Sequence, residues 1–171
     1  SKKPLKILWA SRISYQKRPD LLRKIAAKLG DSVSIDAYGT IEKKQFKPNY
    51  FKDSAITYKG SFSGISSLPT EKYDLYLYTS DTDGIPNILL EIAAKGLPII
   101  ASNVGGISEF IVDRETGLLA HDNSVDGFVT AIEQLRKDSQ LAHGLAVNAQ
   151  KKLRKQHTWS SFLVEVEKDI N

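Results

Sequence analysis

The sequence predicts an α/β domain built on a doubly wound parallel sheet of about six strands. Short apolar runs alternate along the chain with longer segments whose apolar residues recur at helical spacing. This alternation is typical of βαβ units, in which a helix connects two parallel strands. With 171 residues and 41% hydrophobic content, the chain is long enough to form one domain with a substantial core.

The first strand and the first helix show the two patterns most clearly. Residues 5–10 form a short apolar run, which predicts a buried strand. Residues 19–30 place their apolar side chains on one helical face. Pro19 suits the first turn of that helix, Asp20 favours its positive end, and Gly30 is a good stop.

The same alternation continues toward the end of the chain. Further strands are predicted over residues 33–38, 56–59, 74–79, 98–101 and 117–120. Further helices are predicted over residues 86–95, 125–137 and 140–156, with a last one from Thr158. Sheets of this class bind ligands beyond the carboxyl ends of their strands. A site is therefore expected in the loops after residues 10, 38, 59, 79 and 101.

Composition excludes several classes of function. No cysteine is present, so neither a disulfide framework nor a thiolate metal site can form, and a reducing, cytoplasmic setting fits. No apolar run approaches the roughly 18 residues that span a bilayer, and no signal segment opens the chain. The net charge of +4 is too small to indicate nucleic-acid binding, although it would help to attract a diphosphate or an anionic membrane surface.

The loop after the first predicted strand carries two cations, Arg12 and Lys17, five positions apart. A guanidinium fork and an ammonium point charge together suit a diphosphate. Taken alone, such a pair is more often two solvated loop charges.

The loop after residues 74–79 carries acids and a helix start. Asp83 and Glu91 are separated by seven residues, and Gly84 lets backbone approach a ligand closely. The helix beginning near Pro86 would point its N–H groups and positive dipole end into the same crevice, which favours a phosphate. Asp83 would then reach a sugar and Glu91 ribose hydroxyls. In the alternative interpretation, Asp83 caps the helix and Glu91 is a surface acid.

Other residues give weaker signals. The pair Gly105-Gly106 predicts a tight turn into a short helix, with Glu109 on the surface. The tyrosines of residues 75–78 are expected to pack on the sheet. The histidines are scattered singly and indicate neither a metal site nor a catalytic triad: His121, His143 and His157.

Four segments, in this order and spacing, resemble the C-terminal domain of family 4 glycosyltransferases, which share the GT-B fold. Arg12 to Leu22 resembles the family segment R-x4-K-(R/G)-P-D-x-L, and Asp83 to Glu91 resembles its E-x7-E signature. Residues 96–109 resemble the segment that follows, and residues 115–119 resemble the next glycine turn. The resemblance covers nearly the whole chain.

The resemblance implies a role for each matching position. Arg12 and Lys17 would bind the diphosphate and stabilise its charge as it leaves. Asp83 would contact hydroxyls of the donor sugar, and Glu91 would contact the ribose. Further positions would border the nucleotide, the sugar or the phosphates: Gly39, Phe62, Gly84, Ile85, Pro86, Asn87 and Ile88.

The sequence departs from the family pattern at three positions. Ser11 and Pro86 each stand where the family has glycine, and Asp83 replaces the first glutamate of the signature. Proline removes one N–H donor, and aspartate shortens the acid by one methylene. These departures leave the identity of the donor sugar open.

The expected protein is thus a hexosyltransferase domain for carbohydrate biosynthesis that takes a UDP-, GDP- or ADP-sugar and transfers the sugar with retention. No metal and no cofactor are expected. Residues 1–171 would be the donor domain, and a glycan, lipid or protein acceptor would bind a missing N-terminal domain, without which the chain is inactive. The full-length protein is expected in the cytoplasm, with peripheral association at the inner membrane face.

Four alternatives stay open to different degrees. A non-catalytic sugar-nucleotide-binding module would bind without transfer, and a GT-B sugar-nucleotide epimerase would use a similar site. Asp81-Thr82-Asp83 spells D-x-D, the metal-binding signature of GT-A transferases, but three-letter matches are frequent by chance. A nicotinamide-binding domain would need G-x-G-x-x-G after a strand, which the glycines here do not supply.

Overall fold

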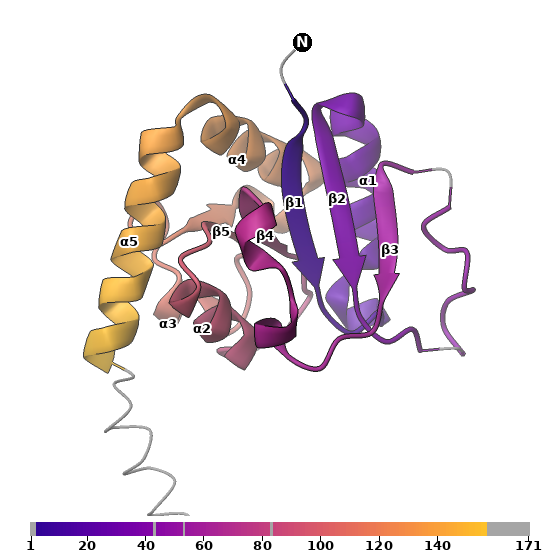
Figure 1. The fold of residues 1–171 in the computed structure, drawn as a ribbon, viewed down its shortest axis with the longest axis horizontal. Coiled ribbons are helices and arrows are strands. Elements are labelled where there is room, and N and C mark those ends of the chain that lie inside the picture. Colours follow the sequence, from indigo (N-terminus) through magenta and orange to yellow (C-terminus); the bar gives the residue numbers. More distant parts are fainter. Residues whose placement is uncertain (1–2, 43, 53, 83, 157–171) are drawn as a thin grey trace, which may run out of the picture.

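The computed structural model describes residues 3–42, 44–52, 54–82 and 84–156, and it contains one six-stranded parallel sheet (Figure 1). The strands are β1 Leu5–Ala10, β2 Val33–Tyr38, β3 Ile56–Gly60, β4 Leu75–Tyr78, β5 Ile99–Ser102 and β6 Leu118–Ala120. All five neighbouring pairs are parallel. The predicted fold class is therefore confirmed.

Helices connect most of the strands. They are α1 Pro19–Leu29, α2 Asn87–Ala94, α3 Ile107–Phe110, α4 Val125–Lys137 and α5 Ser139–Gln156. Short 3-10 turns complete the connections: η1 Tyr15–Lys17, η2 Gly30–Ser32, η3 Ile65–Ser67, η4 Thr70–Lys72 and η5 His121–Asn123. The helix predicted from Thr158 lies outside the described residues. None of the described helices is long and apolar enough to cross a membrane.

The strand order is β3-β2-β1-β4-β5-β6, so the chain reverses its direction of travel across the sheet between β1 and β4. Ile7 of β1 pairs with Leu75 of β4, and Leu8 pairs with Tyr76. The carboxyl ends of β1 and β4 are consequently neighbours. Such a reversal opens a crevice between the loops that leave the two strands, and ligands of doubly wound sheets bind there.

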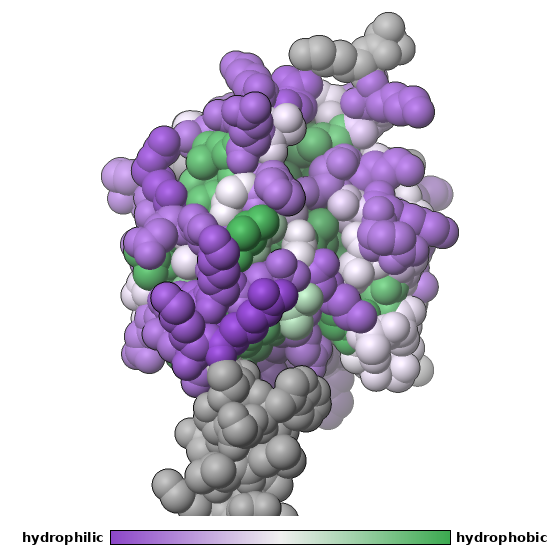
Figure 2. Space-filling view, turned by 60° about the vertical axis from the view of Figure 1, so that its left-hand side comes forward, coloured by the Kyte–Doolittle hydropathy of each residue, from purple (hydrophilic) through white to green (hydrophobic). Residues whose placement is uncertain are grey.

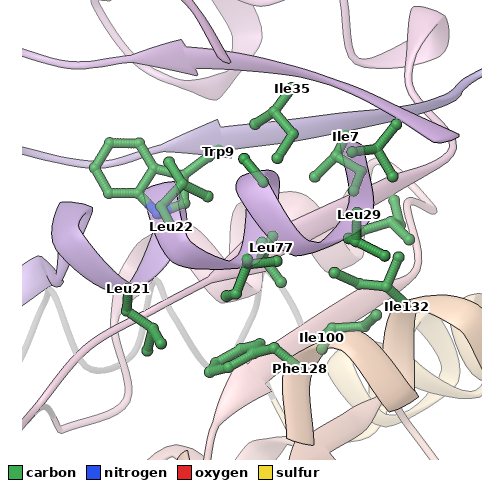
Figure 3. Packing of buried hydrophobic residues seen from close by; sticks show 14 of the residues in the cluster. Ile7, Trp9, Leu21, Leu22, Leu29, Ile35, Leu77, Ile100, Phe128 and Ile132 are labelled. Carbon is green, nitrogen blue, oxygen red and sulfur yellow. The ribbon is translucent and has the colours of Figure 1, made fainter. Parts of the chain in front are cut away.

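The sheet is buried on both faces by two apolar clusters. Side chains of a strand alternate between faces, so Ile7 and Trp9 of β1 enter one cluster while Leu8 and Ala10 enter the other. Figure 3 shows the first cluster, in which α1 and α4 pack on the sheet through residues such as Phe128. α2 and α3 cover the opposite face. Burial on both faces explains why the strands read as continuous apolar runs.

Candidate functional site

The loops after β1 and β4 are joined directly at the carboxyl edge of the sheet. The N–H of Asp81 donates to the carbonyl of Gln16 at 2.9 Å. The side-chain amide of Gln16 donates to the carbonyl of Thr82 at 2.8 Å. Residues 65 and 66 positions apart in the chain thus become partners, because the reversal in strand order places their loops side by side.

Buried hydrogen bonds fix the bases of these two loops. Thr79 is fully buried, and its hydroxyl accepts from Trp9 Nε1 at 3.0 Å and donates to the carbonyl of Lys17 at 2.6 Å. The hydroxyl of Tyr76 donates to the carbonyl of Ala10 at 2.8 Å. Tyr76 and Tyr78 are both buried, as expected for tyrosines that pack on the sheet.

Lys17 lies at the end of β4. Its Nζ donates to the hydroxyl of Tyr78 at 2.9 Å and stands 5.3 Å from the centroid of the Tyr78 ring. Tyr78 is the last residue of β4, and the chain continues from it toward α2. The ammonium group is therefore beside the segment that the sequence predicts to carry the acids and the phosphate-binding helix start.

Arg12 lies nearer to β2. Its loop first follows the segment after β2, because Ile13 and Ile41 form a parallel bridge, and it then crosses to β4. The guanidinium of Arg12 is 66% exposed and stands 3.7 Å from a carboxylate oxygen of Glu42. Arg12 thus lies beside Glu42, whereas Lys17 contacts Tyr78. The two cations share one edge of the sheet but have different neighbours.

The segment from Gly84 to Ile88 enters α2. Pro86 is the N-cap residue in an extended conformation, with φ −69° and ψ 134°, and Asn87 is the first helical residue. Gly84 and Asn87 are exposed, while Ile85, Pro86 and Ile88 are half-buried. Asp83 lies outside the described residues, so its predicted contact with a sugar stays a prediction.

The loop after β5 packs against the segment that leads into α2. A Cβ atom added to Gly106, after β5, would lie 3.2 Å from the backbone of Gly84, so these loops pack closely. Glu91 is exposed on α2. Its side chain is accessible to a ligand, and its predicted contact with ribose remains a prediction.

Gly39 and Phe62 stand after β2 and β3, at the same carboxyl edge. Gly39 packs against the carbonyl of Ser11, and its own carbonyl accepts from the Tyr58 hydroxyl at 2.7 Å. Phe62 is half-buried and packs against the second apolar cluster. Ser11, which replaces the family glycine, is buried.

An ion-pair network that no sequence pattern indicated stands beside Lys17. The guanidinium of Arg18 contacts Asp20 at the start of α1 and Asp81 after β4, each at 2.9 Å. Asp81 and its partner are 63 residues apart in the chain. The motif around Lys17 includes Arg18, but nothing in the local pattern identifies an acid so distant in sequence as its partner.

The acids of the D-x-D match and the histidines are the residues to consider as metal ligands. Asp81 is engaged by Arg18, and Asp83 lies outside the described residues. His121 is exposed, with Nδ1 2.8 Å from a carboxylate oxygen of Asp122. His143 is exposed on α5, and His157 is beyond the described part. In the ranges that the structure describes, no group of three or more His, Cys, Asp or Glu side chains is arranged to hold a metal.

Three hollows on the surface of the described residues lie away from this edge. One of about 630 Å³ lies between α1 and residues 50–55, one of about 440 Å³ lies beside β6 and α4, and one of about 410 Å³ borders α5. None of the three is lined by Arg12, Lys17 or α2.

A parallel sheet with this strand order, and with cationic and helix-start segments at its reversal point, is typical of α/β domains that bind nucleotides. Residues 1–152 match the family model described as glycosyl transferases group 1, and the chain belongs to that family. The resemblance noted in the sequence is confirmed.

The curated relatives that this chain resembles include proteins more than twice its length. It is 27% identical over 145 residues to the O-antigen biosynthesis glycosyltransferase WbnH of Escherichia coli. The matched region covers 84% of this chain and 41% of the relative. It is 24% identical over 168 residues to the sulfoquinovosyl transferase SQD2 of Arabidopsis thaliana. Here the matched region covers 96% of this chain and 32% of the relative. The chain therefore spans less than half of these proteins.

Solved structures share the fold. Anabaena Alr3699/HepE in complex with UDP and glucose matches with a TM-score of 0.86 and 18% identity, over 98% of this chain and 48% of that one. The C-terminal domain of the group 1 glycosyl transferase LpcC from Francisella tularensis matches with a TM-score of 0.75 and 20% identity, over 90% of this chain and 86% of that one. The GT-B type of α/β fold is thereby established.

Proposed function

We propose that this chain is the donor-binding domain of a retaining glycosyltransferase and that it binds a nucleoside-diphosphate sugar at the carboxyl edge of the sheet. The diphosphate would lie between the loop that carries Arg12 and Lys17 and the start of α2. The observation that carries the proposal is the direct joining of this loop to the loop after β4, with the ammonium of Lys17 at the end of β4.

The chemistry of donor cleavage matches these groups. Breaking the sugar–phosphate bond leaves positive charge on the sugar ring and negative charge on the diphosphate. Two cations and the N–H groups of Asn87 and Ile88 at a helix start favour the state in which that charge has formed. Losing one such donor typically raises the barrier by roughly 3–4 kcal/mol. These groups can supply the stabilisation that a metal supplies elsewhere, and a metal-independent transfer is part of the proposal.

UDP is the first nucleotide to test. Solved neighbours include Anabaena HepE with UDP and glucose and the pneumococcal O-GlcNAc transferase GtfA with UDP and GlcNAc. A GDP-mannose-dependent mannosyltransferase of Mycobacterium tuberculosis is also related, at 29% identity over 86 residues. The donor is therefore a UDP-sugar in our proposal, with GDP- and ADP-sugars as the comparison set.

The acceptor would be a glycan, since one relative is a glycosyltransferase of O-antigen biosynthesis, and it would bind a region that lies outside these 171 residues. This follows from the coverage of the relatives, since the chain matches 41% of that protein. The chain alone would then bind donor without transferring the sugar.

A thermal-shift screen tests the proposal. We expect UDP and its sugars to raise the melting temperature, because a ligand that binds only the folded state stabilises it, and the stabilisation grows with the logarithm of the ligand concentration above the dissociation constant. The shift should be the same with Mg²⁺ as with EDTA. The Asp83→Ala variant should lose affinity for the UDP-sugar and keep its affinity for UDP. No shift with any of UDP, GDP, ADP or their sugars would reject the proposed function.

A further inference from the structure

The charged network around Arg18 has no role in the donor site as proposed above. Nε and Nη2 of Arg18 donate to the two carboxylate oxygens of Asp20, both at 2.9 Å. Nη1 donates to Oδ1 of Asp81, also at 2.9 Å. Arg18 follows Lys17 directly and is the N-cap residue of α1. It therefore joins the start of α1 to the loop after β4, and we refer to Arg18, Asp20 and Asp81 as the clasp.

The clasp is well formed although part of it faces solvent. The side chain of Arg18 is 29% exposed and that of Asp81 is 56% exposed. Hydrogen bonds from Arg18 lower the pKa of Asp20, and hydrogen bonds to Asp20 and Asp81 raise the pKa of Arg18. Arg18 and Asp20 are both ionised at neutral pH, as an ion pair requires.

The backbone of Arg18 is held in an unusual conformation. Its φ of 54° and ψ of 52° lie in the left-handed region, which residues other than glycine, asparagine and aspartate seldom adopt. Such a conformation persists where surrounding contacts determine it. The paired bonds to Asp20 and the bond to Asp81 are contacts of that kind, and they act on the residue next to Lys17.

We propose that Arg18 is a positioning residue for the diphosphate site, an inference that rests on the function proposed above. Through Asp20 and Asp81, the clasp holds the loop after β1 against the loop after β4. Lys17 is thereby kept at the end of β4, beside the segment that leads into α2. A site that is arranged before its ligand arrives loses less conformational freedom on binding and binds more tightly.

The Asp81→Asn variant separates positioning from direct contact with the ligand. If Arg18 contacted the diphosphate itself, removing the charge of Asp81 would release Arg18 and make the edge more positive, so affinity for UDP would rise. If Arg18 positions the loop, affinity falls despite the more favourable charge. We expect UDP binding about three- to fivefold weaker by calorimetry, the size of effect typical of a well-made ion pair.

A double variant tests whether Arg18 acts through Lys17. Arg18→Gln should weaken UDP binding in the parent chain and add little in a Lys17→Ala background, because effects that share one route are not additive. Arg136→Gln is the matched control, since Arg136 is 34% exposed and pairs with Glu133 within α4, at 2.6 Å. It should leave UDP affinity unchanged.

Several results would overturn the clasp. Unchanged or tighter UDP binding by Asp81→Asn excludes positioning, and so does full additivity of the Arg18 and Lys17 substitutions. Thermal melting of each variant confirms that it is folded, and Arg18→Lys, which keeps the charge but cannot make the paired bonds, should show an intermediate loss. If the parent chain binds none of UDP, GDP and ADP, the proposed function fails and the role of Arg18 in it falls too.

Discussion

At the scale of single residues, the carboxyl edge of the sheet depends on a glycine. Gly39 has a φ of 152°, a conformation that side-chain-bearing residues rarely adopt, and a Cβ atom there would overlap the carbonyl oxygen of Ser11. Its N–H donates to the carbonyl of Gly60 at 2.9 Å, which fixes the backbone further. Any side chain at this position must displace the loop that carries Arg12.

We predict that Gly39→Ala lowers the free energy of unfolding by more than about 2 kcal/mol, because it combines a steric overlap with a strained backbone. The control is Gly144→Ala on α5, where an added Cβ meets nothing within 4 Å. That change should raise the free energy of unfolding by roughly 0.5–1 kcal/mol, since alanine favours helix over glycine. Urea unfolding followed by circular dichroism measures both. Equal stabilities of Gly39→Ala and the parent chain would contradict the packing described for this edge.

Sequence reasoning finds residues at this scale when their own loop identifies them. Arg12, Lys17 and Glu91 were predicted as site residues because they match family segments that follow predicted strands. Arg18 was not, because its role comes from a carboxylate 63 residues away that only the strand order brings near. Long-range ion pairs of this kind leave no periodic signal in a sequence.

At the scale of elements, the start of α2 shows how a departure from the family pattern is accommodated. Pro86 was expected in the first turn, but its ψ of 134° leaves it just outside the helix as the N-cap residue. Proline has no N–H, so the donors at this helix start come from Asn87 and the residues after it. The helix can still present N–H groups toward a phosphate.

The start of α4 allows a quantitative prediction about an element. Ser124 is its N-cap residue, and the Ser124 hydroxyl accepts from the N–H of Gly127 at 3.0 Å. Ser124→Ala should lower the free energy of unfolding by about 1 kcal/mol, the usual cost of losing such a cap. Chemical denaturation measures the change. Ser66→Ala, at another exposed serine, is the control and should have little effect, and a similar loss in both would show that the cap has no special role.

Most elements are predictable to within one or two residues because their apolar periodicity is strong. The end of β4 shows such a difference of one residue: the apolar run predicts a strand through Thr79, whereas the strand ends at Tyr78. Thr79 leaves the strand because its hydroxyl bonds to Trp9 Nε1 and to the carbonyl of Lys17. The short 3-10 turns η3 and η4, between β3 and β4, have no periodic pattern and were not predicted.

At the scale of the whole molecule, the strand order is what turns separate sequence segments into one site. Periodicity predicts strands and helices but does not order them in a sheet; the resemblance to a known family supplied that expectation. The observed order places the ends of β1 and β4 together, with the loops after β2 and β5 on either side.

The face shown in Figure 2 is predominantly hydrophilic, with small separate apolar areas.

The central claim is that Arg12 and Lys17 bind the diphosphate of a donor at this edge. Calorimetric titration of UDP into the parent chain and into Arg12→Ala and Lys17→Ala tests it most directly. We predict that each variant binds roughly ten- to a hundredfold more weakly, as expected for loss of a charge-assisted hydrogen bond. Lys137→Ala, which removes the same charge from the far end of α4, should bind UDP as the parent does. Unchanged affinity in both Arg12→Ala and Lys17→Ala, measured against a parent that binds UDP, would contradict the assignment.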